Sequence, residues 1–380
     1  MTLSERIQKL KSVFSYEHIA SIEDSPLEIR PYHFEPKIGT HEIKSFRKKI
    51  PTADFCSIPD DHIEENKHYT YTVFVPKGTT QTDRAIVLLH GLNERSWEKY
   101  LPWAEQLCLQ TGAAVILFPI AFHMNRTPKE WSNPRTISPY VDLRKQALKE
   151  AGNTTFVNLA LSSRISQCPI RFYVSGRESI YNIRQLIRGI KNGQHPLFKA
   201  GSSVHLFAYS IGAFLAQILF LSDPDKLLSD SRLFMFCGGT IFSRMDGSAR
   251  DIMDRESFLK MRSYYLNDFL TGNKGYHDSM TKAFKSMLSF PTFREYRESF
   301  FQGIQNRIKA VTLTKDTVIP TIGVREALGS GCSETVLEEW DYPYAYSHQV
   351  PFPVYGKVPA ELVTENFKAL FNKASGFLMQ

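Results

Sequence analysis

The sequence predicts an α/β fold in which a mostly parallel sheet is flanked by helices. Short apolar runs, typical of strands that are buried on both faces, recur along the chain. Helical patterns separate most of these runs, and strands that alternate with helices form right-handed crossovers and parallel sheets. The length of 380 residues leaves room for such a core together with insertions.

Composition excludes several other classes of protein. Apolar residues make up 42% of the chain and charged residues 22%, which excludes disorder as the dominant state. The net charge of +7 is spread along the chain, and the longest basic run, Arg47-Lys48-Lys49, is predicted to be a solvated loop. We therefore expect no nucleic-acid partner. No apolar run reaches about 18 residues, so we expect no membrane partner either.

The cysteines predict a reducing compartment. Their number is odd, and no two have the Cys-x-x-Cys spacing of metal or redox sites. They are Cys56, Cys108, Cys168, Cys237 and Cys332. Residues 1–20 are predicted to form an amphipathic helix that begins with a capping box of Thr2 and Glu5, rather than a signal peptide. We therefore expect a cytoplasmic protein without disulfides.

Seven segments are predicted to be strands. The first, residues 69–75, alternates in polarity and ends at a Pro-Lys-Gly turn. The others are short and mostly apolar, which is typical of strands buried within a parallel sheet. They are residues 85–89, 113–118, 204–208, 233–237, 308–313 and 335–339.

Helices are predicted between and after these strands. Residues 97–110 place Tyr100, Trp103 and Leu107 on one side, and Gly112 is expected to end this helix. Three further segments carry apolar residues at helical spacing. They are residues 178–190, 212–221 and 359–370.

The chain divides into a core and three additions. The core comprises residues 69–240 and 306–380. Residues 1–68 precede it as an N-terminal extension that is expected to pack on the core. Residues 121–170 are interrupted by prolines and are predicted to be an irregular insertion. Residues 241–305 carry three helical patterns rich in Phe, Tyr and Met, which predict a helical cap.

Chemically active side chains directly follow several of the predicted strands. In an open parallel sheet, ligands bind beyond the carboxyl ends of the strands, and these ends share one edge. His90-Gly91, Ser210, Asp316 and His348 each follow a different predicted strand. We therefore expect these residues to lie at one edge of the sheet. The chain contains no dinucleotide fingerprint, phosphate-binding loop or His-Glu-x-x-His motif, so no cofactor or metal is expected.

Ser210 stands between a buried strand and an apolar helix. Ala208 and Gly212 lie two positions before and after it. A nucleophile elbow needs small residues at these positions, because its turn is strained and its flanks crowd the strand and the helix. The N–H of Ile211, at the start of the helix, is a candidate oxyanion donor. The N–H of Leu92, directly after Gly91, is the second candidate.

The order Ser210, Asp316, His348 resembles the catalytic set of the α/β-hydrolase superfamily. His90-Gly91 is similar to the superfamily's oxyanion motif, and the Asp-x-x-Ile-Pro sequence that begins at Asp316 is similar to its acid turn. The resemblance covers roughly residues 69–239 and 308–370, with Ala208 in place of the first glycine of the elbow.

The resemblance implies an α/β-hydrolase fold and acyl transfer through a covalent intermediate. It implies that Ser210 is the nucleophile, His348 the general base and Asp316 the residue that orients the histidine. Asp246 is kept as an alternative acid. The superfamily places its cap after the strand that follows the nucleophile helix, where residues 241–305 lie.

Several residues near the predicted site are candidate substrate contacts. They are His123, Arg126 and Tyr209, with Arg135 as an alternative to Arg126 for holding an anionic group. A loop arginine that donates to carbonyls is the competing interpretation. The aromatic and Met-rich cap favours an ester with an apolar or aromatic acyl part. A serine esterase is the leading interpretation, and an acyltransferase or an inactive hydrolase fold that binds a ligand remain as alternatives.

Overall fold

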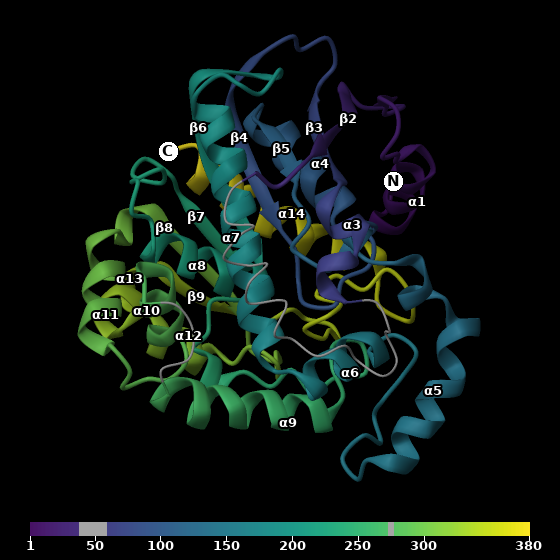
Figure 1. The fold of residues 1–380 in the computed structure, drawn as a ribbon. Coiled ribbons are helices and arrows are strands. Elements are labelled where there is room, and N and C mark those ends of the chain that lie inside the picture. The colour runs from purple at the N-terminus through teal and green to yellow at the C-terminus, as the bar shows by residue number, and fades with distance from the viewer. Residues whose placement is uncertain (38–58, 273–276) are drawn as a thin grey trace.

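One sheet runs through the described part of the chain, residues 1–37, 59–272 and 277–380 of a computed structural model (Figure 1). Its nine strands have the order β1-β2-β3-β5-β4-β6-β7-β8-β9. In this order, every neighbouring pair from β5 through β4 to β9 is parallel, whereas β1, β2 and β3 add an antiparallel edge. The predicted fold class, a mostly parallel sheet flanked by helices, is confirmed. The basic run Arg47-Lys48-Lys49 and Cys56 lie outside the described residues.

Every segment predicted to be a strand contributes to the sheet. These strands are β3 (Tyr69–Pro76), β4 (Thr82–Leu89), β5 (Ala114–Leu117), β6 (Phe198–Tyr209), β7 (Leu233–Phe236), β8 (Ile308–Leu313) and β9 (Leu337–Trp340). The last one begins later than predicted, because the residues before it form α13 (Ser330–Val336). Two further strands, β1 (Ala20–Ser21) and β2 (Leu27–Phe34), come from the N-terminal extension. The extension therefore widens the sheet, in addition to packing on it.

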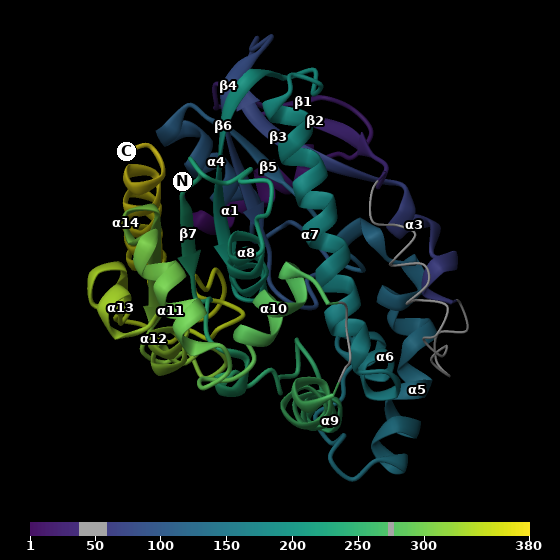
Figure 2. The ribbon, with the colours of Figure 1, turned by 60° about the vertical axis from the view of Figure 1, so that its left-hand side comes forward.

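Helices cover both faces of the sheet. Figure 2 shows α4 (Leu101–Thr111) and α14 (Ala360–Leu378) on one side, with α7 (Ile170–Lys191) and α8 (Ile211–Leu221) on the other. Helix α1 (Leu3–Val13) packs on α4 and begins with the predicted capping box, but it ends earlier than predicted, and Ala20 belongs to β1. No helix of the described residues is long and apolar enough to cross a membrane.

The core lies in two layers because successive side chains of a strand point to opposite faces. Val87 and Leu206 are buried in the layer beneath α7 and α8. Leu88 and Phe207 are buried in the layer beneath α4 and α14. This explains why the central strands are continuous apolar runs. Among the described cysteines, Cys108, Cys168, Cys237 and Cys332 are free thiols.

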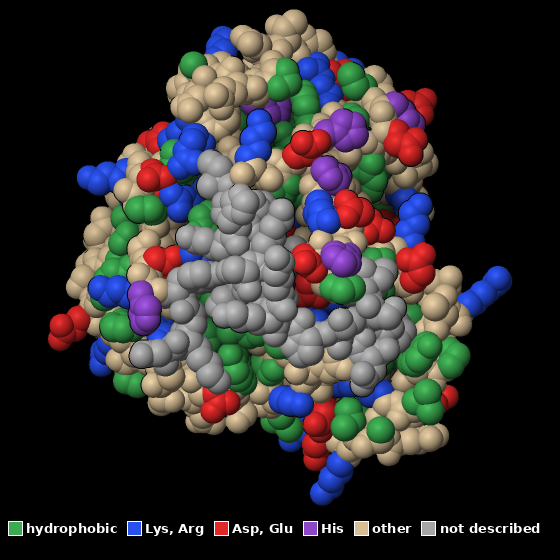
Figure 3. Space-filling model, in the orientation of Figure 1, with side chains coloured by type: hydrophobic (Ala, Val, Ile, Leu, Met, Phe, Trp, Pro, Cys, Tyr) green, Lys and Arg blue, Asp and Glu red, His purple; other side chains and the backbone are tan. Residues whose placement is uncertain are grey.

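The insertion at residues 121–170 is more regular than predicted. It contains α5 (Pro134–Ala147) and α6 (Leu159–Gln167). Pro134 occupies the first helical position, where no N–H is needed, and the Asn133 side chain accepts the N–H of Arg135. Pro134 therefore begins this helix, and Pro139 lies inside it. Helix α5 projects from the body, and apolar side chains gather on it at the lower right of Figure 3.

Three helical segments follow β7, at the sequence positions predicted for the cap. Helix α9 (Arg255–Ser263) continues into a π-helical turn (Tyr264–Phe269). It packs on α6, whereas α10 (Ser279–Ser286) packs on the nucleophile helix α8. Helix α11 (Arg294–Gly303) packs on α12 (Thr321–Leu328) and α13. Only α9 and α10 therefore lie against segments that lead to the candidate site.

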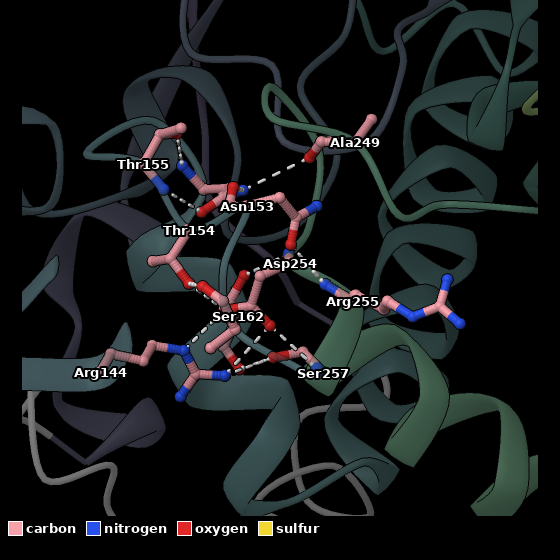
Figure 4. Close-up of polar contacts among 11 residues, drawn as sticks. Arg144, Asn153, Thr154, Thr155, Ser162, Ala249, Asp254, Arg255 and Ser257 are labelled. Atoms are coloured by element: carbon pink, nitrogen blue, oxygen red, sulfur yellow. Dashed lines mark hydrogen bonds and ion pairs between the residues drawn. The ribbon is translucent and has the colours of Figure 1, made fainter. Parts of the chain in front are cut away.

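The two insertions meet at the carboxylate of Asp254, at the start of α9 (Figure 4). This carboxylate accepts hydrogen bonds from Arg144 Nε at 2.6 Å and from Thr154 Oγ1 at 2.9 Å. The Asp254 N–H donates to Ser162 Oγ at 2.9 Å. Burial opposes the charged form, but the Arg144 guanidinium outweighs it, so the pKa of Asp254 is lowered. Asp254 is therefore charged, and its hydrogen bonds join α5, α6 and α9.

Candidate active site

Ser210 occupies a sharp turn between β6 and α8. Its φ of 55° and ψ of −123° are unusual for a residue with a side chain. Such a turn is stable only where its neighbours leave room for it. A Cβ added to Gly212 would lie 2.8 Å from the backbone oxygens of both Leu89 and His90. This close approach explains the glycine two positions after Ser210.

A continuous chain of hydrogen bonds joins Ser210, His348 and Asp316. Ser210 Oγ lies 2.7 Å from His348 Nε2, and His348 Nδ1 lies 2.7 Å from Asp316 Oδ2. The other carboxylate oxygen accepts the N–H groups of Val318 and Ile319, each at 2.9 Å. With these donors on Asp316, the Nδ1 proton of the histidine points to the carboxylate. His348 Nε2 is then left to accept the serine proton.

Tyr209 supports the histidine. The two rings are stacked, with centroids 5.5 Å apart and an interplanar angle of 16°. The Tyr209 hydroxyl donates to the backbone carbonyl of His348. The structure therefore places Tyr209 against His348 and also in the wall of the cavity that borders Ser210, so the substrate contact stays a prediction.

Two backbone N–H groups lie near Ser210 without partners of their own. Ile211 is the first residue of α8, and Leu92 follows the glycine at the end of β4. Within the described ranges, neither N–H donates a hydrogen bond. An N–H at a helix start is also favoured by the helix dipole as a partner for negative charge. This arrangement suits the two predicted oxyanion donors.

His90 holds the loop that carries Leu92. Its Nδ1–H donates to the Gly91 carbonyl at 2.8 Å, and its Nε2 accepts the Ile120 N–H at 3.0 Å. Complete burial lowers the pKa of His90 well below its usual value, and the neighbouring His123 lowers it further. His90 is therefore a neutral link between the loops after β4 and β5, which explains its place before Gly91.

Asn93 is a site residue that sequence reasoning missed. Its φ is +62°, a conformation that Asn tolerates better than most residues. Its side-chain amide donates to the Val157 carbonyl at 3.0 Å and to the Asp251 carbonyl at 2.9 Å. Val157 belongs to the first insertion and Asp251 to the second. Asn93 therefore ties the loop that carries Leu92 to both insertions, and the sequence signal for this is only an Asn two positions after a glycine near a strand end.

The structure contradicts a substrate-binding role for Arg126. The guanidinium is fully buried and lies 4.0 Å from the centroid of the Tyr69 ring. Its hydrogen-bond partners are all protein groups: Asn66, Glu178, Asn182 and the Pro119 carbonyl. Burial lowers the pKa of Arg126 to about 10. Arg126 is a structural residue, and Arg135 lies exposed on α5.

Asp246, the alternative acid, lies elsewhere. Its side chain is exposed and accepts the Ser248 N–H at 2.9 Å. The carboxylate next to His348 is that of Asp316. No cluster of three or more His, Cys, Asp or Glu side chains suited to a metal ion occurs among the described residues.

Two cavities adjoin the serine turn. The larger, of about 640 Å³, borders Ser210 and His348 and is lined by α1 and by the loops at 91–99 and 348–355. The N-terminal extension thus contributes Leu3 and Ile7 to its wall. The smaller, of about 50 Å³, borders Leu92 and Ile211. Most of its wall is apolar: Phe172, Phe214, Leu215, Ile218, Met280 and Phe284.

The sequence matches the family described as "Family of unknown function (DUF6051)" over residues 1–379. The chain belongs to this family. No curated protein is similar to this DUF6051 member in sequence.

Several solved structures are similar to this chain at low sequence identity. A bacterial heroin esterase is 13% identical, with a TM-score of 0.47 over 99% of this chain and 90% of that chain. A vibralactone cyclase is 10% identical, with a TM-score of 0.47 over 99% and 85%. Carboxyl esterase 2 from the mycorrhizal fungus Tuber melanosporum is 10% identical, with a TM-score of 0.43 over 98% and 97%. The fold class of this DUF6051 member, a mostly parallel sheet flanked by helices, follows from its own strand pairing.

Proposed function

We propose that this protein is a serine hydrolase that cleaves an ester through an acyl-enzyme. The main support is the hydrogen-bonded chain of Ser210, His348 and Asp316. A serine that merely began a helix would not need a strained φ, nor a buried histidine oriented by a carboxylate. The two unpartnered N–H groups beside it supply the remaining requirement of acyl transfer.

Each residue has a distinct part in the proposed reaction. Ser210 Oγ attacks the ester carbonyl while His348 Nε2 takes its proton, and Asp316 stabilises the imidazolium that forms. The N–H groups of Leu92 and Ile211 stabilise the oxyanion, each by about 3 kcal/mol of activation free energy. His348 then protonates the leaving alcohol. It next deprotonates the water that releases the acid from Ser210.

The two cavities suit the two halves of an ester. His348 protonates the leaving oxygen, so the alcohol part belongs in the large cleft that His348 borders. The carbonyl oxygen points to Leu92 and Ile211, so the acyl part belongs in the small cavity beside them. A cavity of about 50 Å³ has room for only a few heavy atoms. We therefore propose a short, largely apolar acyl group.

Two experiments test whether the site is active. A fluorophosphonate probe should label Ser210, because only an activated serine reacts with it. The absence of labelling would favour an inactive fold that binds a ligand. Product analysis with water and with added alcohols separates hydrolysis from acyl transfer, since both reactions share the same acyl-enzyme.

We expect a sharp acyl-length limit. With p-nitrophenyl esters, kcat/KM should be highest between the acetyl and butyryl esters and at least about tenfold lower for the octanoyl ester. The reason is that CH₂ groups that do not fit into the small cavity gain no free energy from burial. Met280→Ala should move the limit to longer chains, since Met280 lines the small cavity. Met287→Ala is the matched control, because Met287 is buried but does not line that cavity. Identical length profiles for the two variants would contradict the assignment.

The identity of the acid is tested by a pair of aspartates. Asp316→Ala should lower kcat by about four orders of magnitude, because His348 loses the partner that fixes its tautomer. Asp246→Ala should change kcat by less than about twofold, since its carboxylate is exposed and only caps a turn. Steady-state kinetics with one activated ester measure kcat for both variants. The reverse result would make Asp246 the acid.

A further inference from the structure

A histidine in the wall of the small cavity has a polar atom that the proposed reaction does not use. His123 lines this cavity together with Leu92 and residues of α7, and it also lines a neighbouring cavity of about 70 Å³. It is only 8% exposed. Its Nε2 is buried and has no hydrogen-bond partner in the part of the chain that the structure describes. A buried polar atom without a partner is costly, so this atom calls for an explanation.

The hydrogen bonds of His123 determine what its Nε2 can do. Nδ1 lies 2.9 Å from the Ala121 carbonyl, which only accepts, so Nδ1 carries the proton. Burial lowers the pKa of His123 to about 4, so the ring is neutral at physiological pH. Nε2 therefore has a bare lone pair and can only accept a hydrogen bond.

None of the described protein groups around His123 donates to this lone pair. The His90 ring is 5.2 Å away, but its Nδ1–H already donates to Gly91, and its Nε2 is an acceptor. Among the polar residues of the cavity wall, the Ser175 hydroxyl donates to the Phe172 carbonyl. The Arg177 guanidinium faces the Asp278 carboxylate. A molecule in the cavity can therefore supply the donor that His123 Nε2 lacks.

We propose that the acyl part of the substrate carries a hydroxyl group that donates a hydrogen bond to His123 Nε2. The inference rests on the proposed ester hydrolysis and narrows it to hydroxyacyl esters. A hydroxyl fits this position because it supplies a donor without charge. An ammonium group would have to leave water for a mostly apolar cavity that offers it no carboxylate among the described lining residues, at a much higher cost in free energy.

Three esters of equal acyl length test the inference. The measurement is kcat/KM for p-nitrophenyl butyrate, 2-hydroxybutyrate and 3-hydroxybutyrate, each divided by the rate constant of its alkaline hydrolysis. This division removes the intrinsic effect of the hydroxyl on reactivity. The normalised kcat/KM of one hydroxy ester should exceed that of the butyrate ester by about tenfold or more, because butyrate leaves the buried acceptor His123 Nε2 unpaired. Equal values for all three esters would overturn the inference and leave water as the partner of Nε2.

Variants assign the preference to His123. His123→Leu removes the acceptor at similar size and should reduce the ratio to about one. His123→Gln keeps an acceptor and should retain part of the preference. Met280→Leu, in the same cavity wall, is the control that should keep the wild-type ratio. A preference that persists in His123→Leu would overturn the role of His123, and if that variant does not fold, the wild-type ratio still decides.

The two proposals fail in different ways. If the wild-type protein hydrolyses butyrate without favouring either hydroxy ester, the hydroxyacyl inference fails and the serine hydrolase stands. If it hydrolyses none of the three esters and a fluorophosphonate leaves Ser210 unlabelled, the proposed function fails, and the hydroxyacyl inference that rests on it fails as well.

Discussion

Replacing Ser210 with Ala should abolish ester turnover and leave the protein folded. We expect kcat to fall by about a million-fold, because the covalent step loses its nucleophile. Alanine keeps the Cβ that the strained turn already accommodates, so the melting temperature should change little. Activity on the best p-nitrophenyl ester and a thermal unfolding curve measure the two effects.

The three residues should also behave as one unit. The double variant Ser210→Ala, His348→Ala should be little slower than Ser210→Ala alone, because neither group has its function without the other. A loss of kcat in the double variant that equals the product of the two single-variant losses would show that the two residues act independently. Full activity of Ser210→Ala would remove the nucleophile assignment, and a collapsed unfolding transition would make its kinetic result meaningless.

Replacing Arg126 with Met should cost about 3–5 kcal/mol in the free energy of unfolding. The change removes the cation from a buried ion pair and leaves the Glu178 carboxylate without it, in a place from which water is excluded. Urea denaturation at neutral pH measures the loss as a lower midpoint at unchanged slope.

Arg255 provides the matched control. Its ion pair with Glu150 has a similar separation of 2.9 Å, but both side chains are largely exposed. Arg255→Met should therefore cost less than about 1 kcal/mol. Adding Glu178→Gln to Arg126→Met should recover part of the loss, since it removes the buried charge that the missing cation stabilised. Equal costs for the two arginine variants would show that burial of the Arg126 pair has no energetic consequence.

Those features that depend on local pattern could be predicted from the sequence. Continuous apolar runs marked the central strands, because strands covered by helices on both faces have no polar side. Ser210 could be located because its elbow requires small residues at fixed distances, and a Cβ added to Gly212 would lie 2.8 Å from the backbone oxygens of Leu89 and His90. Asp316 and His348 could be placed because the carboxyl ends of parallel strands share one edge.

Features that depend on distant partners could not be predicted. A lone Arg126 in a loop gives no sign that Asn66 and Glu178, from other segments, surround it. Strand β2 alternates only partly and contains Pro31, which is tolerated because it lies close to the sheet edge. The prolines of α5 suggested a loop, although one of them begins the helix. In each case, contacts with distant segments determine the structural role of the residue, and a single sequence does not show which segments make these contacts.

Asn93 belongs to a core loop, yet both hydrogen bonds of its side-chain amide end on the insertions, 64 and 158 positions further along the chain. One amide thus couples the loop that carries Leu92 to two segments that lie far from it in the chain. We therefore expect a displacement of either insertion to move this loop. A substitution that loosens the chain around residue 157 or 251, outside the proposed catalytic set, should then slow the proposed reaction through the position of the Leu92 N–H.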